Sequence, residues 1–258
     1  MSRLPAYVIG LDCDMVRFGR HRYTAEVAKT EVQFAQAWAF RARCFCVDHK
    51  VDGDDFDRKC KHVLITDTAN DKLVGCFRIL HLSGSGIAQS YSAQFYDLSA
   101  LKNYKGGMLE MGRFCTDPAC ADPDVLRLAW AAITDFVDMH DVQLLFGCSS
   151  FKGTAVAGYT DTFALLKARH LAPSHWMPKI KSPRVHRFAQ LAGDGKTDLK
   201  NGLKQIPPLL RSYLSMGGWV SDHAVVDDRM GTLHVFTGVE VAAIPPARKR
   251  LLRALSSA

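Results

Sequence analysis

Apolar residues follow a helical spacing in the first part of the chain. Phe34, Trp38 and Phe45 are separated by four and seven positions, as on one face of a helix. The preceding Thr30-Glu31-Val32-Gln33 has the form of a capping box, in which the Thr hydroxyl and the Gln side chain bind free amides at a helix start. The pattern therefore predicts a helix over residues 31–45.

The next apolar runs are shorter and are bounded by polar turns. Residues 62–66 and 73–80 are separated by Ala69-Asn70-Asp71, which predicts a β-hairpin. Residues 108–115 predict a further strand, and the run 7–10 predicts a short one near the start.

Helical and extended patterns then alternate along the chain. Asp122 suits an N-cap and Pro123 the first position of a helix, whose apolar stripe continues to about His140. Residues 142–146 predict a short buried strand, followed by Gly147-Cys148-Ser149-Ser150. Further expected elements are a helix over 162–170 and strands at 219–220 and 233–237. This order predicts an α/β sandwich around a mixed sheet.

Composition narrows the class of protein. The 258 residues are 48% apolar and 23% charged, which excludes disorder, collagen and coiled coil as descriptions of the whole chain. No run reaches the roughly 18 apolar residues that a membrane span needs. The start lacks the pattern of a secretory signal, so the eight cysteines are expected to be reduced thiols of a cytoplasmic protein.

Positive charge is concentrated in two stretches. The chain carries a net +7, whereas residues 176–211 and the segment after Val241 together carry +10. This concentration indicates either a solvated rim or a docking surface for an acidic partner. Basic and aromatic residues are not interleaved as in a nucleic-acid-binding motif, and the most basic stretch contains several prolines, so nucleic acid is not expected.

Glu110 is the first candidate for chemistry. A carboxylate within the apolar strand 108–115 is costly unless it has a partner. Arg113 lies on the opposite strand face if the strand is regular, and a bulge at Gly112 would bring the two together. The pair is then either structural or a site where Glu110 orients or deprotonates an amine.

Arg78 and a group of aspartates are the second candidate. Arg78 is either solvent-facing or a bidentate partner for a carboxylate. The aspartates at 52, 54, 55 and 57 form a solvated loop, a brace for Arg41 and Arg78, or a trap for a cationic amino acid. They lack the glycine and glutamate of a calcium loop, so no metal is expected.

The segment Gly147-Cys148-Ser149-Ser150 invites comparison with a nucleophile motif. It is not Gly-x-Ser-x-Gly, and no triad partner is placed for it. Direct attack by an amine is therefore expected, with Ser149 and Ser150 donating hydrogen bonds.

Five blocks in order carry a family resemblance. They are Arg41-x-x-x-Phe45 with the aspartate group, Gly75-x-Phe77-Arg78, Glu110-x-Gly112-Arg113-Phe114-Cys115, Leu145–Thr154 and a C-terminal block at 206–220. With them the chain resembles the bacterial ornithine-lipid N-acyltransferases, which have a GNAT-type fold, and more distantly the acyl-homoserine-lactone synthases. Ordinary GNAT enzymes have a glycine-rich loop that binds coenzyme A. In this chain the segment Thr116–Asp124 is instead rich in Asp and Pro. This difference suits a carrier-bound thioester better than coenzyme A.

The resemblance implies a fold and an activity. The expected fold is a single domain over 1–258, an α/β/α sandwich around a mixed, mainly antiparallel sheet, with a basic extension at about 241–258. The implied enzyme moves a 3-hydroxy fatty acyl group from acyl carrier protein to the α-amine of L-ornithine, with no cofactor of its own. A peripheral contact with an anionic membrane is also expected. Another amine acceptor such as glutamine or glycine, a lactone-synthase-like substrate, and a non-catalytic nucleic-acid-binding protein remain alternatives.

The resemblance also implies roles for individual residues. The implied catalytic residues are Glu110, Arg113 and Ser149. The implied substrate-binding residues are Arg78, Asp52, Asp54, Asp57, Phe45, Phe114, Ser150 and Phe151. The residues expected to dock the carrier are Lys179, Lys181, Arg184 and Arg187.

Overall fold

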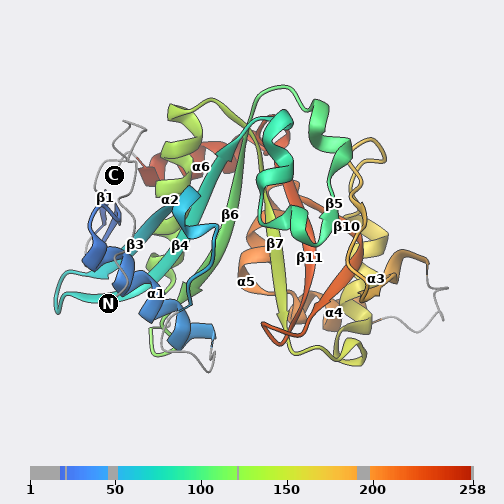
Figure 1. Cartoon of the computed structure of the whole chain (residues 1–258), viewed down its shortest axis with the longest axis horizontal. Helices are drawn as coiled ribbons and strands as arrows, with labels where there is room; N and C mark the ends of the chain where they lie inside the picture. Colours follow the sequence, from blue (N-terminus) through green and yellow to red (C-terminus); the bar gives the residue numbers. More distant parts are fainter. Residues whose placement is uncertain (1–17, 21, 46–51, 121, 191–197, 257–258) are drawn as a thin grey trace. The chain divides into compact units, whose positions relative to one another are not determined.

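The structure is a computed structural model that describes residues 18–20, 22–45, 52–120, 122–190 and 198–256. The strand expected at residues 7–10 lies outside these ranges. The described residues up to Arg78 form one compact unit with Arg113–Phe136, and Ile79–Gly112 and Val137–Ala254 form a second. Strand β4 (Lys72–Leu82), strand β6 (Gly107–Thr116) and helix α2 (Pro123–Met139), which Figure 1 labels, each have residues in both units.

The first unit is built on an antiparallel arrangement next to one long helix. Strand β1 (Phe18–Arg20) pairs with β2 (Tyr23–Val27), and β2 pairs with β3 (Lys61–Asp67), both antiparallel. Strand β4 (Lys72–Leu82) is the next neighbour in the sheet. Strands β3 and β4 are neighbours in the sheet and are joined by a turn at residues 68–71, in which Asp71 has φ 53°, so the predicted hairpin is confirmed.

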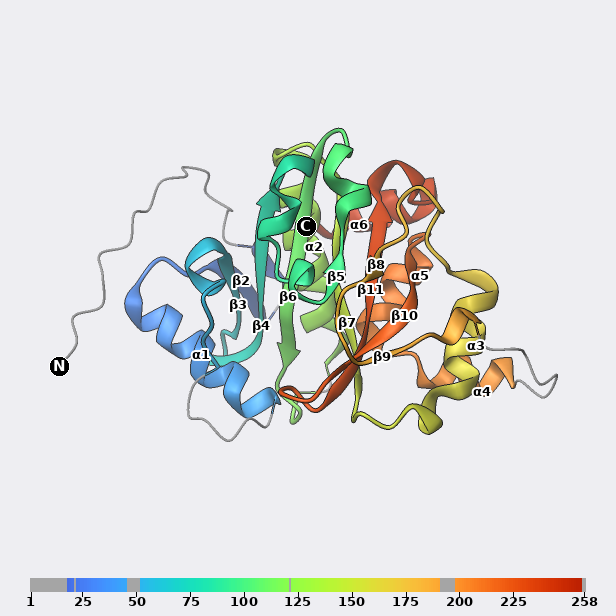
Figure 2. The ribbon, with the colours of Figure 1, turned by 45° about the vertical axis from the view of Figure 1, so that its right-hand side comes forward.

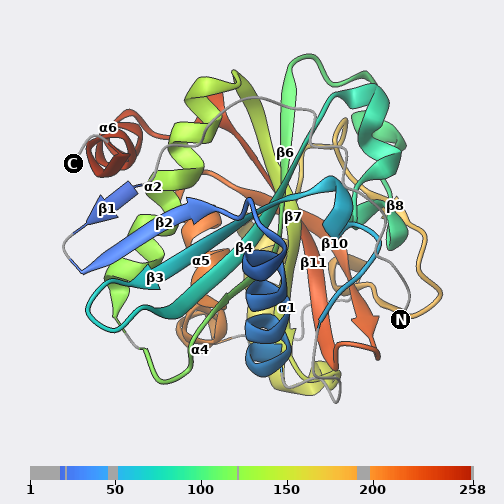
Figure 3. The ribbon, with the colours of Figure 1, turned by 60° about the vertical axis from the view of Figure 1, so that its left-hand side comes forward.

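Helix α1 (Glu31–Phe45) starts as the capping box predicts. The amide of Gln33 donates to Oγ1 of Thr30 at 3.2 Å, and the amide of Thr30 donates to Oε1 of Gln33 at 3.1 Å. The helix packs against β3 (Figure 3), and Phe40 is buried there with Leu64. Helix α2 (Pro123–Met139) also begins at the predicted proline.

The second unit continues the sheet from strand β6 (Gly107–Thr116) and β7 (Val142–Lys152), which pair in parallel. Strand β11 (Thr232–Glu240) pairs antiparallel with β7, β10 (Trp219–Asp227) with β11, and β9 (Val185–His186) with β10. The predicted α/β class with a mixed, mainly antiparallel sheet is therefore confirmed.

Strand β7 is longer than the sequence pattern predicts. Residues 147–152 continue the strand because β11 pairs with it along its whole length, from Lys152 opposite Thr232 to Leu144 opposite Glu240. Gly147 permits a close approach to β6, since a Cβ there would lie 2.3 Å from the carbonyl oxygen of Met111.

The two faces of the sheet in this unit are covered differently. On one face lies the segment Gly84–Asn103, here called the cover segment, with short helices at Gly84–Gln89, Ser92–Gln94 and Ser99–Asn103 and strand β5 (Tyr96–Asp97). Strand β8 (Lys179–Ile180) pairs with β5. On the other face lie α3 (Thr160–Arg169) and α5 (Pro208–Ser215), with α4 (Leu199–Gln205) beside α3 (Figure 2).

Further elements complete the described chain. The remaining short helices are Asp57–Lys59, Val156–Tyr159, Phe188–Gln190 and Val241–Ala243. The basic C-terminal segment contains helix α6 (Pro246–Ser256), in which Arg253 makes two hydrogen bonds of 2.9 Å to Asp138. Within the described ranges, no helix is long and apolar enough to cross a membrane.

Candidate functional site

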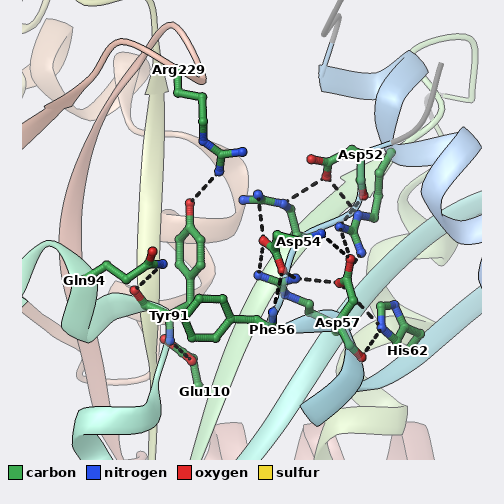
Figure 4. A network of polar contacts seen from close by, with 12 residues as sticks. Asp52, Asp54, Phe56, Asp57, His62, Tyr91, Gln94, Glu110 and Arg229 are labelled. Carbon is green, nitrogen blue, oxygen red and sulfur yellow. Dashed lines mark hydrogen bonds and ion pairs between the residues drawn. The ribbon is translucent and has the colours of Figure 1, made fainter. Parts of the chain in front are cut away.

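The described part of the first unit contains a buried network of three arginines and three aspartates. Figure 4 shows the aspartates Asp52, Asp54 and Asp57 gathered around the guanidinium groups. Helix α1 supplies Arg41, strand β4 supplies Arg78 and strand β6 supplies Arg113. The aspartates come from the single loop between α1 and β3.

Arg41 is the most deeply buried member, with a side chain that is 0% exposed. Its Nε donates to Asp52 at 3.0 Å, and its two terminal nitrogens donate to the two oxygens of Asp57 at 2.8 and 3.1 Å. This is the bidentate geometry in which a guanidinium binds a carboxylate most strongly.

Arg78 and Arg113 both bind Asp54, and each also shares with Arg41 one oxygen of another aspartate, Asp57 for Arg78 and Asp52 for Arg113. Nη1 of Arg78 lies 2.5 Å from an oxygen of Asp54 and 2.5 Å from an oxygen of Asp57. Arg113 forms ion pairs of 2.9 Å with Asp52 and 3.1 Å with Asp54. The three carboxylates therefore hold together three segments that are distant in sequence.

The backbone of Arg113 adopts the left-handed region at φ 53°, which is uncommon for a side chain of this kind. Such a conformation costs on the order of 1–3 kcal/mol and persists only where the surroundings fix it. The two ion pairs of Arg113 supply that constraint.

The network can be buried because the charges of its guanidinium groups and carboxylates compensate one another. Burial alone raises the pKa of Asp57, but the hydrogen bond and charge of Arg41 and the charge of Arg78 outweigh it and hold the pKa at about 2. Burial lowers the pKa of His62, which is therefore neutral and places Nε2 3.1 Å from the carbonyl oxygen of Asp57. The hydrogen bond and charge of Arg78 likewise outweigh burial at Asp54 and lower its pKa, so Asp54 and Asp57 are ionised at neutral pH.

The network matches one of the three sequence hypotheses. Asp52 and Asp57 are buried and brace Arg41 and Arg78, so the solvated-loop hypothesis is wrong for these two residues. Arg78 is also not solvent-facing, because its side chain is 3% exposed and binds Asp54 and Asp57. In the described part of the chain, no group of three or more His, Cys, Asp or Glu is arranged to hold a metal ion.

The second unit holds Glu110, whose carboxylate is buried on strand β6. Its Oε1 accepts hydrogen bonds from the amide of Ser92 at 2.7 Å and from the hydroxyl of Ser92 at 2.6 Å. Its Oε2 accepts from the amide of Tyr91 at 2.8 Å (Figure 4). Three donors of the cover segment thus compensate the burial of this carboxylate.

Cys148 extends the group around Glu110. Its thiol donates to the hydroxyl of Ser92 at 3.5 Å, and Arg229 reaches the hydroxyl of Tyr91 at 3.5 Å. Sequence reasoning missed Tyr91 and Ser92 because the cover segment has no regular periodicity, and it named Cys148 without connecting it to Glu110. Extending the alternation of strand β7 beyond Phe146 would have identified Cys148.

Ser149 does not join this group. Side chains alternate along a strand, so Ser149 lies on the opposite face of β7 from Cys148. Its hydroxyl accepts from Thr237 at 2.9 Å in the interior. Ser149, which was expected to donate a hydrogen bond in catalysis, is therefore not on the face of β7 that carries Cys148, whereas Ser150 is exposed on that face.

The aromatic residues expected to bind substrate fall into different surroundings. Phe151 is buried in the core between the sheet and α3, where its ring lies 5.4 Å from that of Phe163. Phe114 stacks on Phe77 at 5.8 Å. Phe45 is half-buried at the end of α1.

The four residues expected to dock a carrier are exposed and lie in one stretch next to the cover segment. Lys179 is in β8, which pairs with β5, and the ammonium of Lys181 donates to the carbonyl of Ala93 at 2.6 Å. Arg184 forms an ion pair with Asp228. Arg187 is exposed as well.

Comparison with known proteins supports this description. The acetyltransferase (GNAT) domain family matches residues 33–131. The L-ornithine N(alpha)-acyltransferase of Rhodobacter capsulatus is 30% identical over 206 residues, which cover 77% of this chain and 78% of that protein. The protein of the same name from Brucella abortus is 29% identical over 220 residues, covering 82% and 78%.

Among solved structures, an N-acyl amino acid synthase from uncultured soil microbes, FeeM, has a TM-score of 0.47 at 9% identity and covers 92% of this chain and 97% of its own. The acyl-homoserine-lactone synthase LasI has a TM-score of 0.42 at 14% identity, covering 86% and 91%.

Proposed function

We propose, because the chain belongs to the family of the L-ornithine Nα-acyltransferases, that it transfers a 3-hydroxy fatty acyl group from acyl carrier protein to the α-amine of L-ornithine. The chain is an acyltransferase with a GNAT-like fold. The product of the proposed reaction is a lyso-ornithine lipid, and the acyl group arrives as a thioester on the carrier, so the enzyme needs no cofactor of its own.

The observation that carries the proposal is the buried carboxylate of Glu110. An ammonium group is not a nucleophile, so the α-amine must lose a proton before or as it attacks the thioester. Glu110 is a hydrogen-bond acceptor fixed by Ser92 and Tyr91 in a region from which water is largely excluded. We assign to it the deprotonation or orientation of the amine, directly or through a water molecule.

The carrier is proposed to dock at the exposed basic stretch Lys179–Arg187. Acyl carrier proteins are acidic, and opposite charges raise the rate of encounter. The pairing of β8 with β5, and the bond from Lys181 to Ala93, connect this stretch to the cover segment that holds Glu110. Docking there would therefore contact the segment that positions the proposed base.

Charge reversal at two positions tests the docking proposal. We expect Lys179→Glu combined with Arg187→Glu to raise the KM for acyl carrier roughly tenfold with little change in kcat, because only encounter is weakened. Added salt should have the same effect on the wild type, since the Debye length falls to about 3 Å at 1 M. Both effects are measured by release of the carrier thiol.

Lys72→Glu, at an exposed position of the β4 end of the hairpin, is the matched control and should leave the KM for the carrier unchanged. A double reversal that leaves carrier kinetics unchanged but releases the protein from anionic vesicles would assign the surface to the membrane and contradict carrier docking.

The cationic side chain of ornithine is proposed to bind at Asp54. Of the three network carboxylates, Asp54 has the most exposed side chain, at 16%. We expect Asp54→Asn to raise the KM for ornithine about tenfold, the effect of losing one charge-assisted interaction, while the KM for the carrier changes less than twofold, roughly. If neither KM changes, or only that for the carrier does, Asp54 serves the network alone.

The activity itself is tested with purified protein and acyl carrier. The expected result is an N-acylated ornithine, identified by mass spectrometry in the reaction and in lipid extracts of cells that express the chain. Glutamine and glycine are offered in parallel as acceptors. Acylation of either one in preference to ornithine would retain the acyltransferase and refute the proposed acceptor.

A further inference from the structure

His234 lies in the second unit, on the face of the sheet that the cover segment covers. It is on strand β11, two residues before Phe236, and is 2% exposed. Its ring meets Phe95 edge-on at 4.9 Å and Tyr96 at 5.6 Å between centroids. A polar imidazole is therefore enclosed by aromatic residues that otherwise form an apolar cluster.

Two hydrogen bonds define which nitrogen of this ring carries a proton. The hydroxyl of Tyr96 donates its single proton to the backbone carbonyl of His234 at 2.9 Å. The same oxygen lies 3.1 Å from Nδ1 of His234, so Nδ1 must be the donor in that contact. Burial lowers the pKa of His234 to about 4, and the ring is neutral. Nε2 is therefore an unprotonated acceptor.

This acceptor has no partner among the described residues. Nε2 of His234 is buried without a hydrogen bond, although buried polar atoms in folded proteins are nearly always paired. A protein gains nothing in stability from an orphan acceptor inside an aromatic cluster. Its presence indicates a ligand that supplies the missing donor.

The cover segment connects this acceptor to the proposed base. The ring of Phe95 lies against His234 and also 5.4 Å from the ring of Tyr91, whose amide binds Glu110. Phe236, the neighbour of His234 on β11, pairs with Cys148, which donates to Ser92. Residues on both sides of His234 are thus connected, through Tyr91 and Cys148, to the group that positions Glu110.

We propose that Nε2 of His234 accepts a hydrogen bond from a hydroxyl group on the acyl chain and so selects hydroxylated acyl donors. The proposal rests on the proposed function, because it concerns the acyl group of that reaction. A hydroxyl supplies the donor that Nε2 lacks, whereas an unsubstituted chain leaves Nε2 unpaired. A keto group is only an acceptor, so the lone pairs of its oxygen would repel the lone pair of Nε2.

The chemistry predicts an order of substrates for the wild type. With carriers of equal chain length, kcat/KM should fall from the 3-hydroxyacyl to the unsubstituted and then to the 3-ketoacyl thioester. We expect His234→Phe, which keeps an aromatic ring but removes the acceptor, to lower kcat/KM for the 3-hydroxyacyl carrier by about five- to tenfold. The value for the unsubstituted carrier should stay the same or rise.

His234→Gln is a second variant, in which an amide oxygen can replace Nε2 and restore part of the preference. His223→Phe is the matched control. Its imidazole lies 5.2 Å from the ring of Tyr96, its Nδ1 is 2.6 Å from Asp222, and its Nε2 is also buried without a hydrogen bond, so this variant distinguishes the two imidazoles as acceptors. Loss of the hydroxyl preference in His223→Phe alone, or an equal loss for all three thioesters in His234→Phe, overturns the proposal.

A binding measurement separates this inference from the proposed function. The wild type should bind 3-hydroxytetradecanoic acid more tightly than tetradecanoic acid, and His234→Phe should bind both alike. A wild type that acylates no amine refutes the function while these affinities still test His234. Nitrogen NMR offers a further check, since a proton found on Nε2 instead of Nδ1 contradicts the assignment.

Discussion

Glu110→Gln is expected to lower kcat for acyl transfer by about 10²–10⁴-fold, the usual effect of removing a general base. The KM for the acyl carrier should change little, because the docking residues are elsewhere in the chain. The rise of kcat/KM with pH that reports the proposed base should also disappear. A glutamine amide cannot take a proton from the attacking ammonium.

Glu110→Gln should also lower the stability of the fold, and the experiment must separate this effect from the loss of the base. One oxygen that now accepts from Ser92 or Tyr91 becomes an NH₂ group facing a donor, which costs about 1–3 kcal/mol in the free energy of unfolding. Rates are therefore compared per folded enzyme, with thermal unfolding measured in parallel. Glu240→Gln, a half-buried glutamate on β11, is the control and should keep its rate. Wild-type turnover by folded Glu110→Gln would leave Glu110 a structural residue.

The elements that local patterns encode could be predicted from the sequence. The capping box at Thr30 and the Asp122-Pro123 start of α2 act within one turn of helix, so their residue types alone indicate them. The hairpin of β3 and β4 is similar, because its turn residues separate two apolar runs. The length of β7 could not be predicted, because residues 147–152 are extended only through pairing with β11.

The sequence indicated several residues of the candidate site, but it could not indicate which residues they contact. Glu110, Arg78 and Arg113 were identified as polar residues in strands. Their partners come from segments far away along the chain, as Ser92 is from Glu110 and Asp52 is from Arg113, so spacing could not identify the pairs. The sequence could not show on which face Ser149 lies, because the strand predicted over 142–146 is shorter than β7 and omits the alternation that turns Ser149 away from Cys148.

The network of arginines and aspartates also predicts how much stability the protein loses when one of its charges is removed. Asp57→Asn is expected to lower the free energy of unfolding by about 3–5 kcal/mol, since it leaves buried guanidinium charge uncompensated. Asp57 binds both Arg41 and Arg78, so one substitution affects two of the three segments that the network joins. Urea denaturation measures the change. Asp55→Asn, an exposed carboxylate of the same loop, is the control and should stay within about 0.5 kcal/mol of the wild type.

Acid provides an independent measurement of the same charge. The pKa of Asp57 is about 2 in the folded protein, below the unfolded value of about 3.9. The folded state therefore binds fewer protons at this group, and its stabilisation is complete above pH ~5 and is lost as the pH falls towards 2. The stability of the wild type should decrease more steeply over this range than that of Asp57→Asn, which has no proton to gain there. Parallel pH dependences, together with an unchanged urea midpoint, would mean that desolvation cancels the attraction and that the network positions its arginines without stabilising the fold.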